Sequence, residues 1–285
     1  MIRHILKQLL GPAGGPKARD LLHRTGRHVQ RLKEHVLGGG RLREWLLLRL
    51  LKQHYSSKFR RDWLLGGDPP HFFDHRIGIC QFAYGKECIG PYPYYRGFYS
   101  SELLRDGDRL LDIGCGDGFF SQRFFSQRCA QIDAIDIEPS AIQAAVANHA
   151  AANIRYYERD AVAQPFPQES YDVIVWDGAL GHFAPDTTGL MLQKISRALA
   201  RGGVFAGSES LGQEGSDHLQ FFASLEDLAQ AFRPHFQHVL LRSTSYRLSS
   251  GTLRQEAYWR CANDSQRLRE CSWRSFEPMA EGMAA

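Results

Sequence analysis

The stretch that decides the fold of this chain is Leu111-Asp112-Ile113-Gly114-Cys115-Gly116-Asp117-Gly118. A short apolar strand, Arg109–Ile113, runs into three glycines at alternate positions. Glycine lets the backbone turn tightly and lets a ligand lie against bare N–H groups. The dinucleotide-binding spacing G-x-G-x-x-G would need its third glycine where Phe119 stands. The stretch therefore predicts a strand-to-helix turn that leaves room for a ligand but does not match the dinucleotide-binding pattern.

Acids at the next two strand ends support this interpretation. Residues Gln131–Ile137 are predicted to form a buried strand, and Asp136 lies 18 residues beyond Gly118. An acid at that spacing can hold ribose hydroxyls. A third strand, Ile154–Arg159, is followed directly by Asp160. The sequence thus predicts a doubly wound α/β domain with acids along one edge of its sheet.

The order and spacing of these elements, from about residue 100 to residue 261, resemble class I S-adenosylmethionine (SAM) methyltransferases. The last part of the chain is similar to bacterial members met among cell-surface polysaccharide and natural-product enzymes. The resemblance implies an α/β fold with a seven-stranded Rossmann-like sheet, mostly parallel with an antiparallel last strand. It also implies a SAM-dependent methyltransferase with SAM as cofactor. We take the methyltransferase domain as residues 101–262.

The resemblance also assigns cofactor contacts. Backbone N–H groups around Gly114–Gly116 would bind the methionyl portion, and Asp112 would brace that loop or meet the cofactor amine. Asp136 would take the ribose hydroxyls, while Asp160 and its neighbour would meet adenine. The full expected set is Asp112, Gly114, Cys115, Gly116, Asp136, Ile137, Asp160, Ala161 and Trp176.

Further elements are expected downstream. Asp186 is the expected N-cap of a helix over 186–200, which the glycine pair at 202–203 would end. Ser224 is the expected N-cap of the next helix, with Asp227 at the capping-box position. The predicted strands are Tyr171–Trp176, Val204–Glu209, Phe236–Arg242 and Ala257–Cys261.

Candidates for acceptor chemistry follow the fourth strand. A hydroxyl acceptor must lose its proton, and a histidine that titrates near neutrality is the commonest helper. His182 is therefore the candidate general base, and Asp177 would orient it or bind the acceptor; His218 is a more remote candidate. The strand ends in Trp-Asp-Gly-Ala, which argues against methylation of DNA bases because the Asn/Asp-Pro-Pro-Tyr/Phe run is absent. We expect no metal site.

Composition is ordinary for a soluble protein, with 43% hydrophobic and 23% charged residues. No apolar run approaches the ~18–20 residues of a membrane-spanning helix, and the first residues lack a secretory signal. Six cysteines show no C-x-x-C pairing, which favours reduced thiols in a cytoplasmic protein.

Charge is unevenly distributed. Residues 1–70 carry 15 Lys/Arg against 5 Asp/Glu, a balance of +10, whereas the whole chain stands at +4, which leaves −6 for the remainder. We interpret 1–70 as a basic helical extension. It packs on the domain or on a second subunit, attaches peripherally to an anionic membrane, or binds nucleic acid, which is the less favoured of these partners. A cleaved targeting peptide is a further alternative.

Residues 71–100 are crowded with aromatic side chains, and glycines and prolines predict a loop. Their place before the first strand indicates a lid over the cofactor. Arg96 or a tyrosine of this segment is a candidate for the cofactor carboxylate. Residues 263–285 are expected to be a flexible tail.

The function expected from these patterns is SAM-dependent O-methylation of a small-molecule or sugar-containing acceptor, with an unspecified oligomeric state. Two alternatives remain open at this stage. The chain is an RNA methyltransferase that uses the basic extension, or a catalytically inactive SAM-binding partner subunit. The patterns leave the acceptor itself unidentified.

Overall fold

A computed structural model describes Leu46, Arg49 and residues 92–212, 218–247, 253–264 and 266–269. The chain divides into two compact units, 1–58 and 59–285. In the first unit only the helical positions Leu46 and Arg49 are described, so the expected basic extension lies almost wholly outside the described residues. The same holds for most of the expected aromatic lid and for residues 270–285. Everything below concerns the second unit.

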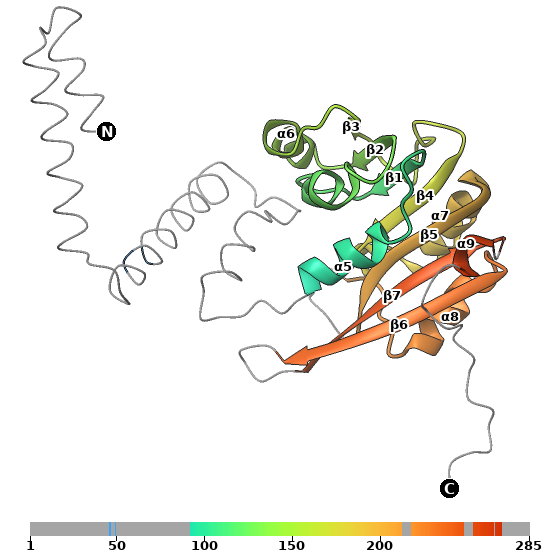
Figure 1. Ribbon diagram of the computed structural model, residues 1–285. Coiled ribbons are helices and arrows are strands. Elements are labelled where there is room, and N and C mark those ends of the chain that lie inside the picture. Colours follow the sequence, from blue (N-terminus) through green and yellow to red (C-terminus); the bar gives the residue numbers. More distant parts are fainter. Residues whose placement is uncertain are drawn as a thin grey trace, which may run out of the picture. The chain divides into compact units, whose positions relative to one another are not determined.

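A seven-stranded sheet forms the centre of the second unit, in the order β3-β2-β1-β4-β5-β7-β6 (Figure 1). Strands β1 to β5 are parallel, and β7 runs antiparallel to both of its neighbours. This confirms the expected mixed sheet with an antiparallel last strand. The strands are β1 Arg109–Ile113, β2 Gln131–Asp136, β3 Ile154–Glu158, β4 Tyr171–Asp177, β5 Leu199–Leu211, β6 His238–Arg247 and β7 Leu253–Ala262.

Helices cover both faces of this sheet. Alternate residues of a strand point to opposite faces, and β5 shows this directly, since Phe205 and Ala206 belong to different apolar clusters. Phe205 packs with side chains of α7 and α8, and Ala206 lies in the cluster that receives tyrosines of α5. The helical elements are α5 Tyr92–Ser101, η2 Ser121–Phe125, α6 Pro139–Asn148, η3 Leu180–His182, α7 Pro185–Ala198, α8 Leu225–Phe232 and α9 Gln266–Arg269.

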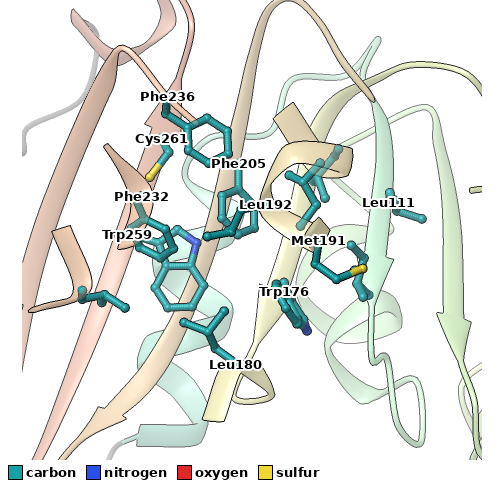
Figure 2. Packing of buried hydrophobic residues seen from close by; sticks show 14 of the residues in the cluster. Leu111, Trp176, Leu180, Met191, Leu192, Phe205, Phe232, Phe236, Trp259 and Cys261 are labelled. Carbon is teal, nitrogen blue, oxygen red and sulfur yellow. The ribbon is translucent and has the colours of Figure 1, made fainter. Parts of the chain in front are cut away.

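The largest apolar cluster lies between the sheet and α7 and α8 (Figure 2). Phe205 of β5 stacks on Phe236 with ring centroids 5.4 Å apart, and Trp259 of β7 lies against Phe232 at 5.1 Å. Trp176 belongs to the same cluster, is 1% exposed and packs edge-on against Phe183. The Trp176 side chain is therefore part of the core, and a cofactor contact at this position would have to use its backbone.

Residues 92–101 form the helix α5, whereas the glycines and prolines predicted a loop. Proline is tolerated in a first helical turn, where its missing N–H has no partner in any case, and Pro93 is the second residue of α5. Gly97 is needed inside the helix because a Cβ there would lie 2.6 Å from the ring of Phe124. The glycine thus permits close packing of α5 on η2.

The helix α7 begins one residue earlier than expected. Its N-cap is Ala184, which makes no side-chain cap, and Pro185 occupies the first turn; Asp186 is therefore not the N-cap. The helix ends at Ala198, and β5 runs straight through the glycine pair at 202–203 that was expected to end the helix. In α8 the expected cap is confirmed, since the Ser224 hydroxyl accepts the backbone N–H of Asp227.

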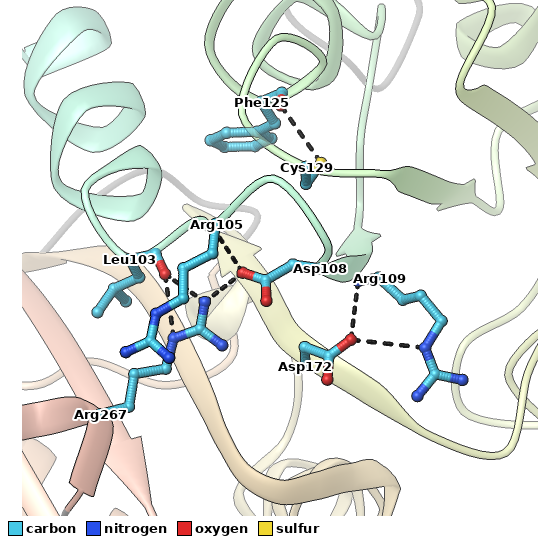
Figure 3. A network of polar contacts seen from close by, with 8 residues as sticks. All are labelled: Leu103, Arg105, Asp108, Arg109, Phe125, Cys129, Asp172 and Arg267. Carbon is cyan, nitrogen blue, oxygen red and sulfur yellow. Dashed lines mark hydrogen bonds and ion pairs between the residues drawn. The ribbon is translucent and has the colours of Figure 1, made fainter.

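The first residues of the expected tail form the anchored helix α9 (Figure 3). Arg267 is 7% exposed, donates to the Leu103 carbonyl and forms an ion pair with Asp108. Asp108 in turn accepts the backbone N–H of Arg105 at 2.8 Å. This pair ties the chain after β7 to the turn before β1. Within the described residues, no helix combines the length and apolar character needed to cross a bilayer.

Candidate active site

The glycine turn after β1 has the conformation that its sequence predicts. Gly114, Gly116 and Gly118 have φ angles of 69°, 54° and 75°, and among the described residues no side-chain-bearing residue has a positive φ. A Cβ on Gly118 would lie 2.5 Å from the Tyr156 hydroxyl. That hydroxyl donates to the His149 carbonyl at 2.7 Å and is held in place. The turn is therefore closely packed against β3.

The backbone N–H groups of this turn are used within the protein. Those of Gly114 and Cys115 donate to the Ile135 carbonyl at 2.9 and 3.1 Å, and that of Gly116 donates to Asp136 Oδ2 at 2.8 Å. They are thus not the ligand donors that the resemblance implied. The Cys115 side chain is also directed away from a ligand, since it is buried in the cluster behind the turn. The three N–H groups instead hold the turn, whose glycines carry no side chains, in place beside Asp136.

Asp136 is the point where β1 and β2 meet at the carboxyl edge of the sheet. Its Oδ1 accepts the Glu138 N–H at 2.9 Å while Oδ2 accepts that of Gly116. Burial raises the pKa of this carboxyl, and the backbone donors oppose the rise. Each carboxylate oxygen has two acceptor sites, so both oxygens can accept a further hydroxyl. This donor and acceptor chemistry fits a ribose.

Apolar side chains flank the acids at two neighbouring strand ends. Ile137, directly after Asp136, is 66% exposed, and Val162, two residues after Asp160, is 40% exposed. Strands β2 and β3 are adjacent and parallel, which places both at the same edge of the sheet. Exposed apolar surface beside a hydroxyl-binding acid suits the faces of a purine ring. The residues present therefore fit an adenosine group.

The Asp160 turn is held from the helix α7. Asp160 Oδ1 accepts the N–H groups of Val162 and Ala163 at 2.8 and 3.1 Å. Lys194 Nζ donates to the carbonyls of Ala161 and Gln164 and lies 4.4 Å from the Phe166 ring centroid. Burial lowers the pKa of Lys194. The lysine is a support that sequence patterns did not indicate.

Asp112 lies beneath the glycine turn and is 4% exposed. Burial raises its pKa to about 7, with further increases from Asp177 and Asp136; a hydrogen bond from the Ser121 hydroxyl and the charge of Arg96 act the other way. Asp112 can therefore gain or lose a proton near neutral pH. Such a group can brace the loop in its neutral form and balance a cationic amine in its ionised form.

Arg96 reaches the site from α5. Its Nη2 donates to the Asp177 carbonyl at 3.1 Å, and its guanidinium carbon lies 4.5 Å from the Phe120 ring centroid. Its charge lowers the pKa of both Asp112 and Asp177. The guanidinium thus faces two carboxyls on neighbouring strands. Sequence reasoning named Arg96 among candidates for the cofactor carboxylate, and the structure places it beside the glycine turn.

Asp177 lies at the end of β4 and is hydrogen-bonded to the neighbouring strand β5. Its Oδ1 accepts a hydrogen bond from the Ser208 hydroxyl at 2.9 Å. The residue is 6% exposed, and this burial raises the pKa of its carboxyl. The carboxyl that lies beside histidine is Glu209 of β5, which sequence reasoning missed. Its Oε1 is 3.9 Å from His218 Nε2. The expected role of Asp177, to orient His182 or bind the acceptor, stays a prediction.

The two candidate histidines, of which His218 was the more remote candidate for the acceptor chemistry, lie together. His182 ends the short helix η3 and is exposed, and its ring centroid is 4.4 Å from that of His218. His218 is also stacked near Phe221, at 6.0 Å. Among the described residues no group of three or more His, Cys, Asp or Glu side chains is arranged to hold a metal ion. The pair is suited to accept a proton from a bound hydroxyl or ammonium group.

Comparison with known proteins places this geometry in a family context. Residues 110–203 match the model of a methyltransferase domain. An uncharacterised methyltransferase of Schizosaccharomyces pombe is 32% identical over 138 residues, which cover 45% of this chain and 53% of the relative. A 27-O-demethylrifamycin SV methyltransferase of Amycolatopsis mediterranei is 34% identical over 107 residues, with coverages of 36% and 39%.

Other relatives bear different names. The EEF1A lysine methyltransferase 4 of Mus musculus is 28% identical over 155 residues, covering 50% of this chain and 60% of the relative. A chain of the complex between the Haloferax volcanii Trm112 methyltransferase activator and a methyltransferase has a TM-score of 0.51 at 16% identity, with coverages of 67% and 95%. That likeness concerns the fold. This chain spans about half the length of the first curated relatives it matches.

Proposed function

We propose that this chain, whose domain belongs to the class I SAM-dependent methyltransferases, transfers a methyl group from SAM to an acceptor. The acceptor would bind beside the ends of β4 and β5. The observation that carries this proposal is the Asp136 carboxylate, fixed by the Gly116 N–H at 2.8 Å with acceptor sites left for ribose hydroxyls. The exposed Ile137 next to it provides an apolar surface for adenine.

The remaining donor contacts follow from the same edge of the sheet. Asp160 and Ala161 would meet the adenine amino group and ring, in a turn that Lys194 supports. Asp112 and Arg96 would face the charged amino and carboxyl groups of the methionyl portion, one acid for the amine and one guanidinium for the carboxylate. The pKa of Asp112 is about 7 in the absence of the cofactor. A cationic amine bound nearby would lower this pKa and favour the ionised carboxylate, because opposite charges attract.

SAM, when bound, supplies a methyl group on a positively charged sulfur that is already electrophilic. The protein therefore has to align an acceptor and provide a place for its proton. His182 is exposed at the end of η3, next to β4, and is our candidate for the group that takes this proton. Asp177 lines the same region through its backbone carbonyl, which Arg96 holds.

For the acceptor we propose a hydroxyl group of a small molecule or a sugar-containing compound. Leu219 and Phe221, which are 64% and 46% exposed, follow His218 and offer an apolar surface for such a molecule. One relative is named for a demethylrifamycin and another for a protein lysine, so relatives differ in acceptor. The acceptor screen must therefore include amines as well as alcohols.

The test has two parts. Calorimetry with S-adenosylhomocysteine measures binding of the donor site directly, and transfer of a radiolabelled methyl group from SAM is then followed on matched sets of glycosides, phenols, amines, lysine-containing proteins and RNA. The proposal expects saturable binding and transfer to a hydroxyl set. Transfer to RNA that weakens steeply with salt would favour the basic extension as the substrate-binding part. Binding without transfer to any set would favour a SAM-binding partner subunit.

A further inference from the structure

Glu209 is a carboxyl buried at the carboxyl end of β5, and it is 3% exposed. Its Oε2 accepts the Gly181 N–H at 2.8 Å, and Oε1 accepts the N–H of Ser210 at 3.0 Å. Buried carboxyls are rare unless they are paired or hydrogen-bonded. The first bond links β5 to η3, the short helix that carries His182, and the second holds the carboxyl against its own strand. The carboxyl therefore fixes the backbone from which the candidate base projects.

His218 is positioned against the same backbone. A Cβ on Gly181 would lie 2.1 Å from His218 Cδ2 and 2.9 Å from Nε2, so the imidazole rests directly on the glycine. The residues that follow are tied to it as well, because the N–H groups of Leu219 and Gln220 donate to the Gly181 carbonyl at 2.8 and 3.2 Å. Position 181 must be glycine for His218 to occupy this place.

The side chains of His182, His218 and Glu209 form a series in which exposure to solvent decreases from the first to the last. His182 is exposed, the His218 side chain is 11% exposed, and the Glu209 side chain is 4% exposed. The ring centroids of the two histidines are 4.4 Å apart, with 34° between their planes, and His218 Nε2 lies 3.9 Å from Glu209 Oε1. An imidazolium in this series has a buried negative charge beneath it.

Charged groups on β4, β5, β7 and α5 surround the three side chains. Burial raises the pKa of Glu209, while the Gly181 and Ser210 N–H groups, His218 and His182 lower it. Asp177 of β4 interacts with Glu209 electrostatically, and Arg96 balances Asp177 from α5. On β7, Glu256 is paired with Ser210 in register and forms an ion pair with Arg254. Arg96 and Arg254 offset the other two acids, and Glu209 is the acid that lies next to His218.

We propose that Glu209 is a positioning residue that holds His218 and, through the contact of the two rings, keeps His182 ready to take the acceptor's proton. This inference rests on the proposed methyl transfer and defines the acceptor class for it. The acceptor atom carries a proton, as a hydroxyl or an ammonium does. A carboxylate acceptor is disfavoured, since it has no proton to give and would lie near two buried acids, Glu209 and Asp177.

The step balances without any further reactant. An ammonium acceptor first gives a proton to an imidazole nitrogen of His182, because its nitrogen has no lone pair until then, whereas a hydroxyl gives its proton to the imidazole during attack. The acceptor oxygen or nitrogen forms its bond to the methyl carbon, and the carbon–sulfur bond breaks with its electron pair on sulfur. In both cases a positive charge appears on the imidazole, where the buried carboxylate of Glu209 stabilises it. The proton leaves to water from the exposed ring.

The first test compares Glu209→Gln with the control Glu226→Gln, whose carboxyl lies on the exposed side of α8 in an ion pair with Arg233. With a hydroxyl or amine acceptor, we expect kcat of Glu209→Gln to fall about 10- to 100-fold and the acid limb of its pH–rate profile to move to lower pH. S-adenosylhomocysteine affinity should stay within about twofold of the wild-type value, as in the control. An unmoved limb would overturn the proposal.

The second test needs no acceptor and separates this inference from the proposed function. Carbon NMR of labelled glutamate follows the Glu209 carboxyl in the wild-type chain, in His218→Asn and in the control His238→Asn, which changes a residue of β6. Because the imidazoles lower the pKa of Glu209, His218→Asn should move its titration to higher pH. An unchanged titration contradicts the proposal even if the cofactor binds. Absent cofactor binding with a moved titration contradicts only the proposed function.

A double-mutant cycle checks the contact on which the proposal depends. Gly181→Ala should displace the His218 ring and lower kcat, because the new methyl group occupies the position of the imidazole. In a His218→Ala background the same substitution has no ring to displace. We expect the loss from Gly181→Ala to shrink at least about threefold there. Equal losses in both backgrounds would show that Gly181 acts independently of His218.

Discussion

The donor half of the site, around β1 to β3, and the acceptor half, around β4, β5 and β7, are built in different ways. In the donor half, the functional acids lie at the ends of strands, and backbone hydrogen bonds fix them, as with Asp136 and Gly116. In the acceptor half, residues far apart in the chain meet: His218 reaches Glu209, and the Gln220 side chain donates to the Leu180 carbonyl. The donor half is thus local, and the acceptor half is tertiary.

The largest expected effect is on the acceptor half. His182→Gln should lower kcat about 100- to 1000-fold, because a general base of the commonest kind is removed. Affinity for S-adenosylhomocysteine should be unchanged, since the donor half does not use this residue. Steady-state kinetics and calorimetry on the same sample measure both, with His238→Gln as the control. A matching loss of donor affinity would show that the two halves are not separate.

A matched pair of glycine substitutions probes how rigid the donor half is. Gly118→Ala places a Cβ 2.5 Å from the anchored Tyr156 hydroxyl at a φ of +75°, whereas a Cβ on Gly114, at +69°, meets nothing nearer than Ala179 Cβ at 3.8 Å. We expect Gly118→Ala to lower the free energy of unfolding by about 3 kcal/mol and Gly114→Ala by about 1 kcal/mol. Denaturant unfolding measures both, and equal losses would contradict the packing of the turn against β3.

The pH dependence of stability tests the buried acid beneath the donor half. The pKa of Asp112 is raised to about 7, so the folded chain binds a proton there that the unfolded chain releases near its ordinary value. Stability from this group is therefore present at low pH and is lost as the pH rises toward 7. Between pH 5 and pH 7 the loss should be about 2 kcal/mol.

The variant Asp112→Asn should be free of this loss, so that its stability changes less with pH than that of the wild-type chain. Urea unfolding at a series of pH values measures the difference. The control Asp172→Asn changes an acid that lies on β4 and bonds with Arg109. A wild-type chain that gains stability between pH 5 and pH 7 relative to Asp112→Asn would contradict the raised pKa.

The smallest effect is expected at the adenine end of the donor half. Lys194→Met removes the two hydrogen bonds to the Asp160 turn but keeps the apolar contact with Phe166. Each such bond to a partly exposed group contributes on the order of 1 kcal/mol. Affinity for S-adenosylhomocysteine should therefore fall about fivefold, with kcat unchanged. An unaltered affinity would show that the turn is stable without support from α7.

The same contrast explains what the sequence could predict. The glycine turn and the acid at Asp136 follow from local spacing, and the seven-stranded sheet was expected from the family resemblance. Glu209 could not be found in this way, because an acid within an apolar strand acquires its role from the Gly181 N–H and from His218. No local pattern encodes these contacts.

The wrong loop prediction and the unexpected burial of Trp176 have the same origin. The helix at Tyr92–Ser101 was missed because the ring of Phe124, which requires Gly97, is distant in sequence. Trp176 was named as a cofactor contact because it lies at the end of a functional strand, but its side chain packs with Phe183 in the core. In both cases tertiary packing overrode a local indication.

The central claim is that Asp136 and the glycine turn bind the nucleoside of SAM, and calorimetry with S-adenosylhomocysteine tests it most directly. Glu158→Ala is the matched control, since this exposed acid pairs with Asp136 in the register of β3 on β2. The account predicts saturable binding by the wild-type chain and by the control, and an affinity about 100-fold lower for Asp136→Ala. Binding by Asp136→Ala as tight as that of the wild-type chain, or no binding by the wild-type chain, would contradict it.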